Sequence, residues 1–536
     1  MAMICLIFLL GALTAKITSG YTHPCALRDY GDERKVCVCN ATYCDTITRK
    51  ENTIDRDEFM TLVSSKDGLR FQKNIGKFSQ NETKPGATSN SVLSWLLGSS
   101  TSETLILTIN TTVRYQKIVG FGGAFTDAAG INILSLGKEM QEMLLRSYFS
   151  DEGIEYNLCR VPVSGTDFST HPYSYDDNNR LPDPLLKNFS LAKEDLKYKI
   201  PMILRAQSMS KRNIKLVAAS WSPPPWMKTN NDFSGLSFLK PEYYDSYAKY
   251  ILRFLDEYNK NNVTIWAIST GNEPSNGVLP VKHFNSLGWT PLGIANWTTH
   301  YFGPQLRSST HNQTLILAFD DQRLFLPWWI DLMVKANRRV LDFIDGIAIH
   351  WYWDMFISDN VIKELHQNYP SKFLLYTEAS QGDKPWEKKV ELGSWERGEA
   401  YLADIIENLN AWVTGWMDWN LALDEQGGPT WAKNYVDSPI LVNASGGEFY
   451  KQPMFYAIGH VTKFIERDAE RIEISPSDQT EIQATAVVNP DARLVIVIIN
   501  KGNVEKNVSI QVPRKGWMNF NLPARSFATI VCDLKD

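Results

Sequence analysis

From about residue 118 onward, short apolar runs alternate with longer stretches of helical periodicity. The short runs are rich in β-branched and aromatic residues, which is typical of buried strands. We predict strands at 118–125, 154–161, 214–220, 263–270, 315–319, 346–350, 373–378 and 413–419. Strands that alternate with helices eight times predict a (β/α)8 TIM barrel.

One of the intervening helices is clear from its periodicity. Pro241 stands at a suitable first helical position, and apolar residues then recur at three- and four-residue spacing. These residues are Tyr244, Tyr247, Ile251, Phe254 and Tyr258. We interpret this stripe as the side of the helix that packs against the barrel.

After about residue 467 the pattern changes to alternating strands without helices between them. We predict strands at 471–474, 482–488, 494–500, 508–512 and 528–532. Such a series of strands is typical of a β-sandwich. The segment 51–115 is also strand-like, and we expect it to complete the same sandwich together with 467–536.

The first 20 residues resemble a secretory leader. An apolar stretch at 4–13 is followed by the small residues Thr18, Ser19 and Gly20, although no Lys or Arg precedes the stretch. The alternative, a buried helix or membrane anchor, is disfavoured because the stretch is shorter than the ~20 residues that span a bilayer. Since no other stretch approaches that length, we expect no transmembrane segment and a soluble mature protein made in the secretory pathway.

Composition narrows the classes of partner. The chain has 536 residues, 43% of them apolar, which is enough for a large core and two or three structural units. The net charge of −5 comes without a long basic run, so binding to nucleic acid or to anionic membranes by charge alone is not expected.

Four cysteines, Cys25, Cys37, Cys39 and Cys44, lie close together after the leader. In a secreted chain this predicts a disulfide staple, and among the three connectivities we favour Cys25–Cys37 with Cys39–Cys44. A zinc knuckle is the alternative, but a single residue between Cys37 and Cys39 is less than the usual ligand spacing. Two further cysteines lie in apolar strands and are interpreted as buried core thiols: Cys159 and Cys532.

Nine Asn-X-Ser/Thr sequons are spread along the chain and predict that several are glycosylated. They begin at Asn40, Asn81, Asn110, Asn188, Asn262, Asn296, Asn312, Asn443 and Asn507.

Two predicted strands end in a glutamate. The run 263–268 leads into Asn272, Glu273 and Pro274, and the run 373–377 leads into Glu378. In a barrel of this kind, catalytic side chains lie at the carboxyl ends of the strands. Two such glutamates are the pair of carboxyl groups needed to cleave a glycosidic bond.

Other predicted strand ends add carboxylates, amides and indoles, as a sugar site needs. They are Arg160, Asp167, Trp221, Asp320, Asp321, Arg323, His350, Trp351, Tyr352, Asp418 and Trp419. Taken singly, the carboxylates are commonly helix caps or solvated charges, and the tryptophans are commonly core residues. For Asp320 and Asp321 we favour a structural ion-pair network over catalysis. A His/Asp/Glu metal cluster is the competing functional interpretation, but the chain has no HExxH motif or closely spaced His pair.

Several motifs together resemble the lysosomal β-glucosidases of glycoside hydrolase family 30, and the resemblance covers essentially the whole mature chain. The motifs are Gly-Phe-Gly-Gly-Ala-Phe-Thr-Asp at 120–127, Arg-Val-Pro at 160–162, Asn-Glu-Pro-Ser at 272–275, Phe-Asp-Asp-Gln-Arg at 319–323, His-Trp-Tyr at 350–352, Gly-Trp-Met-Asp-Trp-Asn at 415–420 and Lys-Gln-Pro-Met-Phe-Tyr at 451–456.

The resemblance implies a role for individual residues. Glu273 would be the acid/base and Glu378 the nucleophile, with no cofactor and no metal. The glucosyl group would be held by Asp167, Trp221, Asn272, Trp419 and Asn434. Supporting roles would fall to Arg160 and Tyr352 beside the nucleophile, and to Arg323 and His350.

The resemblance also implies an organisation and an activity. The barrel would comprise 116–420 and 453–466, and a third, small antiparallel unit would combine 21–50 with 421–452. The expected reaction is hydrolysis of glucosylceramide at a membrane or vesicle surface in the lysosome, assisted by a saposin-like activator. The alternatives are a relative that cleaves another β-glucoside or a β-xyloside, and a catalytically silent glycolipid-binding protein.

Overall fold

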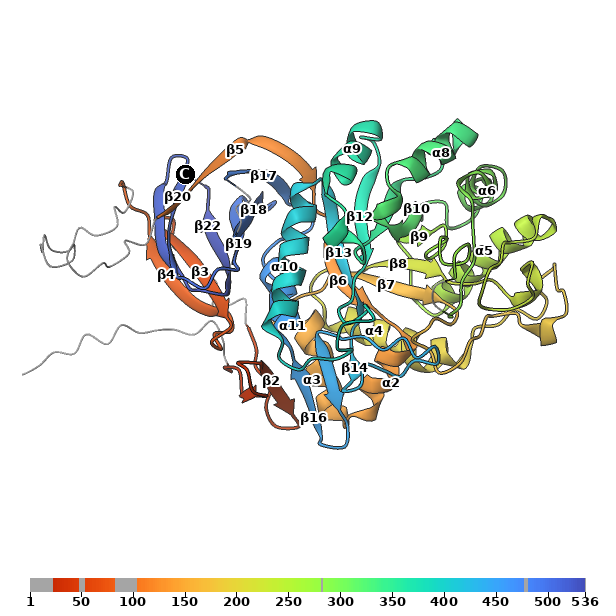
Figure 1. The fold of residues 1–536 in the computed structure, drawn as a ribbon, viewed down its shortest axis with the longest axis horizontal. Coiled ribbons are helices and arrows are strands. Elements are labelled where there is room, and N and C mark those ends of the chain that lie inside the picture. Colours follow the sequence, from red (N-terminus) through yellow and green to blue (C-terminus); the bar gives the residue numbers. More distant parts are fainter. Residues whose placement is uncertain (1–22, 48–53, 82–103, 281–282, 477–480, 536) are drawn as a thin grey trace, which may run out of the picture.

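The computed structural model describes residues 23–47, 54–81, 104–280, 283–476 and 481–535, so the predicted leader at 1–20 lies outside it. It contains a closed eight-stranded barrel, a nine-stranded sheet and a five-stranded sheet (Figure 1). The barrel and the nine-stranded sheet lie at opposite ends of the molecule in this view, and the small sheet lies below them. Among the described residues, no helix combines the length and the apolar character needed to cross a membrane. The predicted fold class is confirmed.

The barrel is parallel and follows chain order around its circumference. Three strands differ from the prediction by three residues or more, and one of them, the fifth, ends at Gln322 instead of residue 319. The second strand begins at Leu158 instead of residue 154, because Glu155 has a left-handed backbone (φ +60°) that interrupts the extended run. The fourth comprises only Ala267–Ser269, although the residues before it are apolar and largely buried. The strands are β6 (Gly120–Ala124), β7 (Leu158–Val163), β8 (Lys215–Ser220), β9 (Ala267–Ser269), β10 (Leu315–Gln322), β11 (Gly346–His350), β12 (Phe373–Glu378) and β13 (Val413–Asn420).

A layer of fully buried side chains fills the barrel interior. Seven of the strands contribute to this layer with Leu158, Val217, Ala267, Leu317, Ala348, Leu375 and Met417. In β6, Gly122 pairs with Met417, and a Cβ at Gly122 would lie 1.7 Å from the carbonyl oxygen of Leu158. Only glycine therefore allows β6 and β7 to approach this closely.

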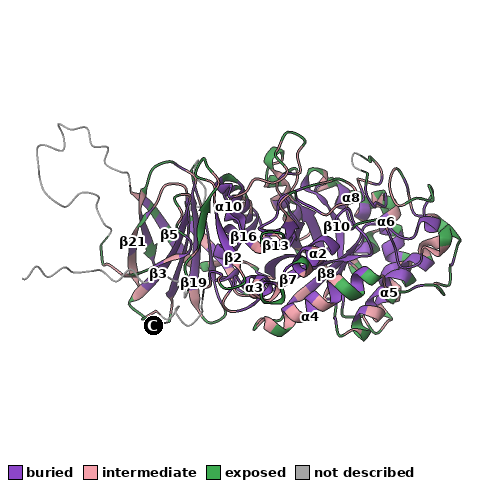
Figure 2. Cartoon of the chain, turned by 90° about the horizontal axis from the view of Figure 1, so that it is seen from below, coloured by how far each residue is buried: buried purple, intermediate pink, exposed green. Residues whose placement is uncertain are grey.

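Amphipathic helices cover the outside of the barrel. The predicted stripe lies on α5 (Tyr244–Lys260), where Tyr247, Ile251, Phe254 and Tyr258 are buried and Tyr244 is half-buried. Figure 2 shows the exposed residues of α4 and α5 on their outward sides and the buried strands inside. The other helices are α2 (Asp127–Ser135), α3 (Lys138–Phe149), α4 (Ile200–Met209), α6 (Pro291–Trp297), α7 (Gly303–Arg307), α8 (Trp328–Ala336), α9 (Asn360–Asn368), α10 (Trp395–Asn410) and α11 (Pro453–Thr462).

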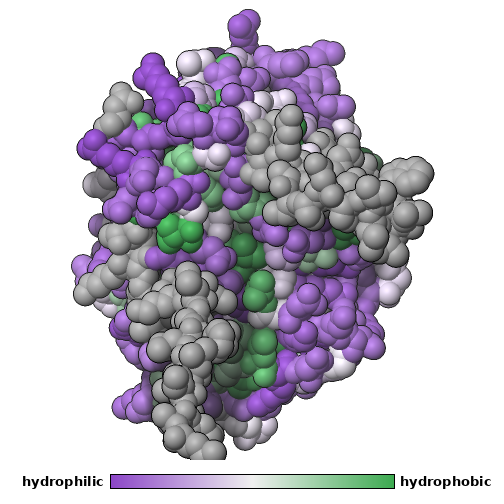
Figure 3. All heavy atoms as spheres, turned by 90° about the vertical axis from the view of Figure 1, so that its left-hand side faces the viewer, coloured by the Kyte–Doolittle hydropathy of each residue, from purple (hydrophilic) through white to green (hydrophobic). Residues whose placement is uncertain are grey.

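The nine-stranded sheet has the order β21-β20-β5-β17-β18-β19-β22-β3-β4. A β-bridge between Ser79, just after β4, and Trp517 of β21 joins its two edges, so the sheet folds back on itself as a sandwich around its own apolar core. On the outer face of this end, apolar side chains form an interrupted band between hydrophilic ones (Figure 3). The strands are β3 (Glu58–Ser65), β4 (Gln72–Lys77), β5 (Leu105–Lys117), β17 (Glu470–Ser475), β18 (Ile482–Val488), β19 (Arg493–Asn500), β20 (Lys506–Val512), β21 (Gly516–Leu522) and β22 (Ser526–Asp533).

The small sheet has the order β1-β2-β16-β15-β14, and its β14–β15 pairing is parallel while the others are antiparallel. Disulfides join Cys25 to Cys37 and Cys39 to Cys44, which confirms the favoured connectivity and leaves no thiolates there for zinc. Cys159 and Cys532 are buried and free, as predicted. The strands are β1 (Leu27–Asp29), β2 (Lys35–Asn40), β14 (Leu423–Asp424), β15 (Ile440–Asn443) and β16 (Glu448–Lys451).

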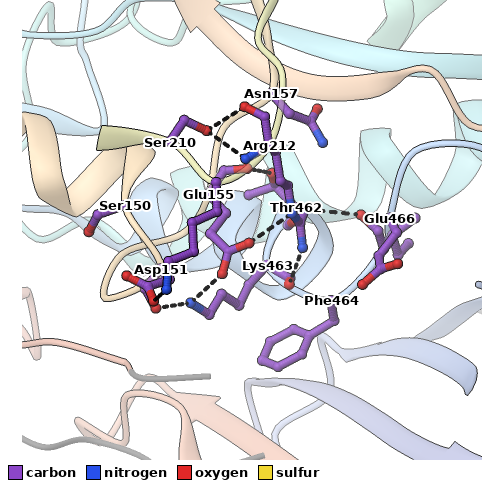
Figure 4. A network of polar contacts seen from close by, with 12 residues as sticks. Ser150, Asp151, Glu155, Asn157, Ser210, Arg212, Thr462, Lys463, Phe464 and Glu466 are labelled. Atoms are coloured by element: carbon purple, nitrogen blue, oxygen red, sulfur yellow. Dashed lines mark hydrogen bonds and ion pairs between the residues drawn. The ribbon is translucent and has the colours of Figure 1, made fainter. Parts of the chain in front are cut away.

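A buried ionic network connects parts of the chain at the amino-terminal end of the barrel strands (Figure 4). Glu155, before β7, pairs with Lys463 at the end of α11 (2.9 Å) and with Arg212 before β8 (2.7 Å). Lys463 also donates to the carbonyl oxygens of Asp151 (2.7 Å) and Ile47 (3.3 Å). Because barrel enzymes carry their chemistry at the opposite end, we interpret this network as structural.

Candidate active site

Glu273 and Glu378 meet at the carboxyl end of the barrel. Glu378 is the last residue of β12, and Glu273 follows β9 in a loop whose backbone is tied to neighbouring strands. Asn272 N–H donates to Ser220 O, and Glu273 N–H donates to Asp320 O, both at 2.9 Å. One oxygen of each glutamate lies within 4.8 Å of the other and of a ring nitrogen of His350. The glutamate side chains keep 14% and 7% of their surface exposed, so a ligand can reach both.

Glu378 is held by two donors. Arg160 Nη1 forms a short ion pair with Glu378 Oε2, and the hydroxyl of Tyr352 donates to Oε1 at 2.7 Å. Burial, and then the negative charge of Glu273, raise the pKa of Glu378 above its ordinary value, although His350 and Arg160 oppose this shift. The two donors fix the direction of the carboxylate and favour its charged form.

Arg160 also connects Glu378 and Asn272 to a buried aspartate. Its Nη2 donates to Asn272 Oδ1 at 2.8 Å and to Asp320 Oδ2 at 2.7 Å. Burial alone would raise the pKa of Asp320, but Arg160 and His350 hold it well below its usual range. Asp320 is therefore a permanent anion in an ion-pair network, as we favoured from the sequence.

His350 is a buried cation between two carboxylates. Burial lowers its pKa, but Glu378, Asp320 and Glu273 outweigh burial and raise the pKa to about 10. Both ring nitrogens therefore carry a proton at neutral pH. Nδ1 donates to Glu273 Oε1 and Nε2 donates to Asp320 Oδ1, each at 3.1 Å.

Aromatic and amide side chains lie beside this centre. Trp221 and Trp419 stack with ring centroids 5.1 Å apart, and the guanidinium of Arg160 lies 4.7 Å from the ring of Trp221. Asp167 accepts a hydrogen bond from Asn434 Nδ2 at 2.8 Å, which connects the β7 loop to the segment after β14. A flat indole suits the C–H face of a sugar ring, and paired polar groups suit its hydroxyls.

The structure places Arg323 apart from the two glutamates. Its guanidinium pairs with Asp354 (3.0 Å) and Glu407 (2.9 Å) at a cavity of about 280 Å³ beside the site. Tyr352, which donates to Glu378, also lines this cavity. Arg323 therefore lies beside the centre, at a cavity that it shares with Tyr352.

Glu273, His350 and Glu378 are close enough together to be considered as metal ligands. A metal needs a neutral imidazole with a free lone pair, whereas His350 is cationic at neutral pH. The guanidinium of Arg160 also lies against Glu378. This donor set does not suit a metal ion.

Gln322 and Thr377 complete the network and were not predicted. Gln322 Nε2 donates to Glu273 Oε1 at 2.8 Å, and Thr377 Oγ1 donates to Asp320 Oδ1 at 2.6 Å. Thr377 directly precedes Glu378 on β12, and this adjacency could have identified it from the sequence. Gln322 reaches the site through an irregularity in β10 that the sequence does not reveal.

Comparison with protein families gives two matches on this chain. Residues 118–465 match the glycosyl hydrolase family 30 TIM-barrel domain, and residues 468–530 match the family 30 beta sandwich domain.

Individual proteins agree with these matches. Lysosomal acid glucosylceramidase of Mus musculus is 39% identical over 511 residues, covering 94% of this chain and 95% of its own. A protein of Caenorhabditis elegans named as a glucosylceramidase is 38% identical over 500 residues, covering 92% of each chain. The crystal structure of SrfJ from Salmonella typhimurium superposes with a TM-score of 0.79 at 26% identity, covering 89% of this chain and all of its own.

Proposed function

The chain belongs to glycosyl hydrolase family 30, and from this premise we propose that it is a retaining β-glucosidase that hydrolyses glucosylceramide to glucose and ceramide. The observation that carries the proposal is the convergence of Glu273 and Glu378, whose nearest oxygens lie within 4.8 Å. Retaining glycosidases hold their carboxyl groups ~5–5.5 Å apart, whereas inverting enzymes leave ~6.5–9.5 Å for a water molecule.

In the first step, the carboxylate of Glu378 attacks the anomeric carbon of glucose. The bond from that carbon to the ceramide oxygen breaks through an oxocarbenium-like transition state, and Glu273 gives its proton to the departing oxygen. Arg160 and Tyr352 direct the Glu378 carboxylate, since each donates to a different oxygen. The product of this step is a glucosyl ester on Glu378.

In the second step, Glu273 acts as a base. It takes a proton from a water molecule, whose oxygen attacks the anomeric carbon and releases Glu378. Two inversions at the same carbon return the β configuration. Neither step requires a cofactor.

We propose that Asp167, Trp221, Asn272, Trp419 and Asn434 hold the glucosyl group. Two observations support this: the indoles of Trp221 and Trp419 lie against Arg160, and Arg160 binds both Asn272 and Glu378. Asp167 and Asn434 form a hydrogen-bonded pair that offers an acceptor and an amide to sugar hydroxyls.

We further propose that the protein works on glucosylceramide at a lysosomal membrane or vesicle surface, with help from a saposin-like activator. The supporting observation is the 39% identity to the mouse lysosomal acid glucosylceramidase. The leader at 1–20, on which entry to the secretory pathway would depend, lies outside the described residues.

The test is hydrolysis of glucosylceramide in anionic vesicles, compared with galactosylceramide and with an aryl β-xyloside. We expect turnover of glucosylceramide that exceeds turnover of the other two, and an increase on addition of saposin. Preference for the xyloside would indicate a different family 30 activity. Binding of glucosylceramide without turnover would indicate a silent binding protein.

A further inference from the structure

Strand β10 contains a β-bulge beside the active site. Phe319 pairs with Ala348 and Asp321 pairs with Ile349, so the intervening Asp320 has no counterpart on β11. Phe319 (φ +80°) and Asp320 (φ +57°) both adopt the left-handed backbone region, which is costly for residues other than glycine. Bulges of this kind redirect side chains near active sites. After the bulge, Gln322 lies opposite His350.

Gln322 and His350 converge on the same oxygen of Glu273. Gln322 Nε2 donates to Glu273 Oε1 at 2.8 Å, and His350 Nδ1 reaches it at 3.1 Å. Gln322 is 6% exposed, so these donors do not compete with bulk water. An oxygen that accepts two hydrogen bonds is a poor position for a proton, which leaves Oε2 as the protonated oxygen.

The bulge also holds the backbone around Glu273. Glu273 has a left-handed backbone (φ +42°), and its N–H donates to Asp320 O at 2.9 Å. Ser275 donates its N–H (2.8 Å) and its hydroxyl (3.0 Å) to the carboxylate of Asp321. Three consecutive residues of β10, Asp320, Asp321 and Gln322, therefore fix the loop and the side chain of the acid/base.

We propose that Gln322 is a positioning residue for acid catalysis, which together with His350 keeps the proton of Glu273 on Oε2, where the leaving group receives it. The inference rests on the proposed function, because it takes Glu273 as the acid/base. The proton moves from Oε2 to the glycosidic oxygen as the carbon–oxygen bond breaks and the bond to Glu378 forms. Gln322 itself exchanges no proton.

The experiment compares two substrates in the full-length protein. Dinitrophenyl β-glucoside has a leaving group that needs no proton, whereas an alkyl β-glucoside needs one. For Gln322→Met, which preserves volume but removes the donor, we expect kcat/KM on the alkyl glucoside to fall about ten- to hundredfold. The value for dinitrophenyl glucoside should stay within about twofold, because only proton transfer is affected.

A second variant gives a readout that a purely structural role would not change. Gln322→Glu keeps the shape of the side chain but places a carboxylate beside Glu273. Since like charges oppose ionisation, the acid form of Glu273 should persist to higher pH. We expect the basic limb of the kcat/KM profile to move upward by about one pH unit.

The matched control is Gln452→Met. Gln452 is also buried, and its Nε2 donates to a carboxylate oxygen of Asp437 at 2.6 Å. Its acceptor is therefore neither of the two glutamates. This variant should affect both substrates equally. Melting curves of all variants identify any loss of folding, and the isosteric Gln322→Glu tests the inference if Gln322→Met fails to fold.

Two outcomes would overturn the inference: equal losses on both substrates for Gln322→Met, or an unmoved basic limb for Gln322→Glu. Glu273→Ala in the same assays distinguishes failure of the inference about Gln322 from failure of the proposed function. If Glu273→Ala loses kcat/KM on the alkyl glucoside but keeps the kcat/KM of glucosyl-enzyme formation from dinitrophenyl glucoside, while Gln322→Met shows no such difference, the assignment of Glu273 stands and the role of Gln322 is wrong. If Glu273→Ala keeps full activity on the alkyl glucoside, the assignment of Glu273 itself is wrong.

Discussion

As the proposed nucleophile, Glu378 must be ionised, yet it is buried beside another carboxyl group. Burial and Glu273 raise its pKa, and the donors Arg160 and Tyr352 act in the opposite direction. The balance between these influences sets the acid side of the activity profile. Hydrogen bonds to the charged form of a carboxylate are a means of adjusting that balance.

The first prediction follows from the hydroxyl of Tyr352. Without this donor, the pKa of Glu378 rises further, so Tyr352→Phe should move the acid limb of kcat/KM to higher pH by roughly one unit. The measurement is a pH profile with an aryl β-glucoside. The control is Tyr376→Phe, another buried tyrosine, whose hydroxyl donates to Asp354 instead (2.7 Å). An acid limb that stays in place or moves downward in Tyr352→Phe would contradict the prediction.

At the residue scale, the sequence identified the groups at strand ends. Glu273 and Glu378 each follow or end an apolar run, so they lie at the barrel mouth because the parallel strands end there. Arg160 lies inside β7. Gln322 is different, because its place depends on the extra residue in β10, and no sequence pattern marks a bulge made of Phe319 and Asp320. The position of Arg323 at the end of a predicted strand also predicted that it lies at the site, but the bulge directs its guanidinium toward Asp354.

At the scale of elements, the pattern of apolar residues located the barrel strands because their cores are continuously buried. It overestimated β7 and β9 because burial also marks the irregular segments before them: Ile154 and Val263 are fully buried outside any strand. It missed β21, where only Met518 and Leu522 are fully buried and Trp517 and Phe520 are half-buried, so apolar and polar residues do not alternate cleanly. Apolar periodicity thus predicts which residues are buried. Whether they form a strand also depends on the partner strand with which they pair.

The second prediction concerns the disulfide staple. β2 lies between β1 and β16, and Cys37 pairs with Leu27 on one side and Lys451 on the other. Replacing Cys37 or Cys39 by Ser should lower the free energy of unfolding by about 2–5 kcal/mol and reduce secretion. Neither disulfide contains a residue of the proposed mechanism, so kcat of the folded fraction should not change.

The control for the staple is Cys532→Ala, which removes a buried cysteine that forms no disulfide. Its cost should be smaller, since it removes one small core group and no cross-link. Equal melting temperatures for Cys37→Ser and the unaltered protein would show that the staple does not stabilise the fold.

Across the whole molecule, several buried carboxyl groups have a raised pKa and so remain protonated to a higher pH than usual. Burial raises the pKa of Asp127 and Asp404 to about 6, although Lys199 and Arg323 oppose it, and burial together with the charge of Glu273 raises that of Asp321 to about 7. Burial places the pKa of Asp418 well above the ordinary range as well. The pKa of His460 changes in the opposite direction, because burial lowers it to about 3.

The third prediction is that the folded protein is more stable in mild acid than at neutral pH. A carboxyl with a raised folded pKa stabilises the fold fully below its unfolded value, ~4, and that stability is lost as pH rises through the folded value. Burial lowers the pKa of His460, His366 and Lys228, so these groups reduce stability as pH falls, but the carboxyl groups with a raised pKa are more numerous. Melting curves should therefore give a midpoint a few degrees higher at pH ~5.5 than at pH ~7.5. A higher midpoint at pH ~7.5 would contradict this balance.

The central claim is that Glu378 forms the covalent bond and Glu273 only moves protons. Azide rescue of two variants, with the anomeric configuration of the product read by NMR, tests it most directly. In Glu378→Gly, azide should attack from the vacated face and give the α-glucosyl azide, which is inverted. In Glu273→Ala, dinitrophenyl glucoside should form the glucosyl-enzyme and stall, and azide should release it as the β-glucosyl azide, which is retained. Products of the opposite configurations would show that the two roles are exchanged, and an α product from both variants would show that no covalent intermediate forms.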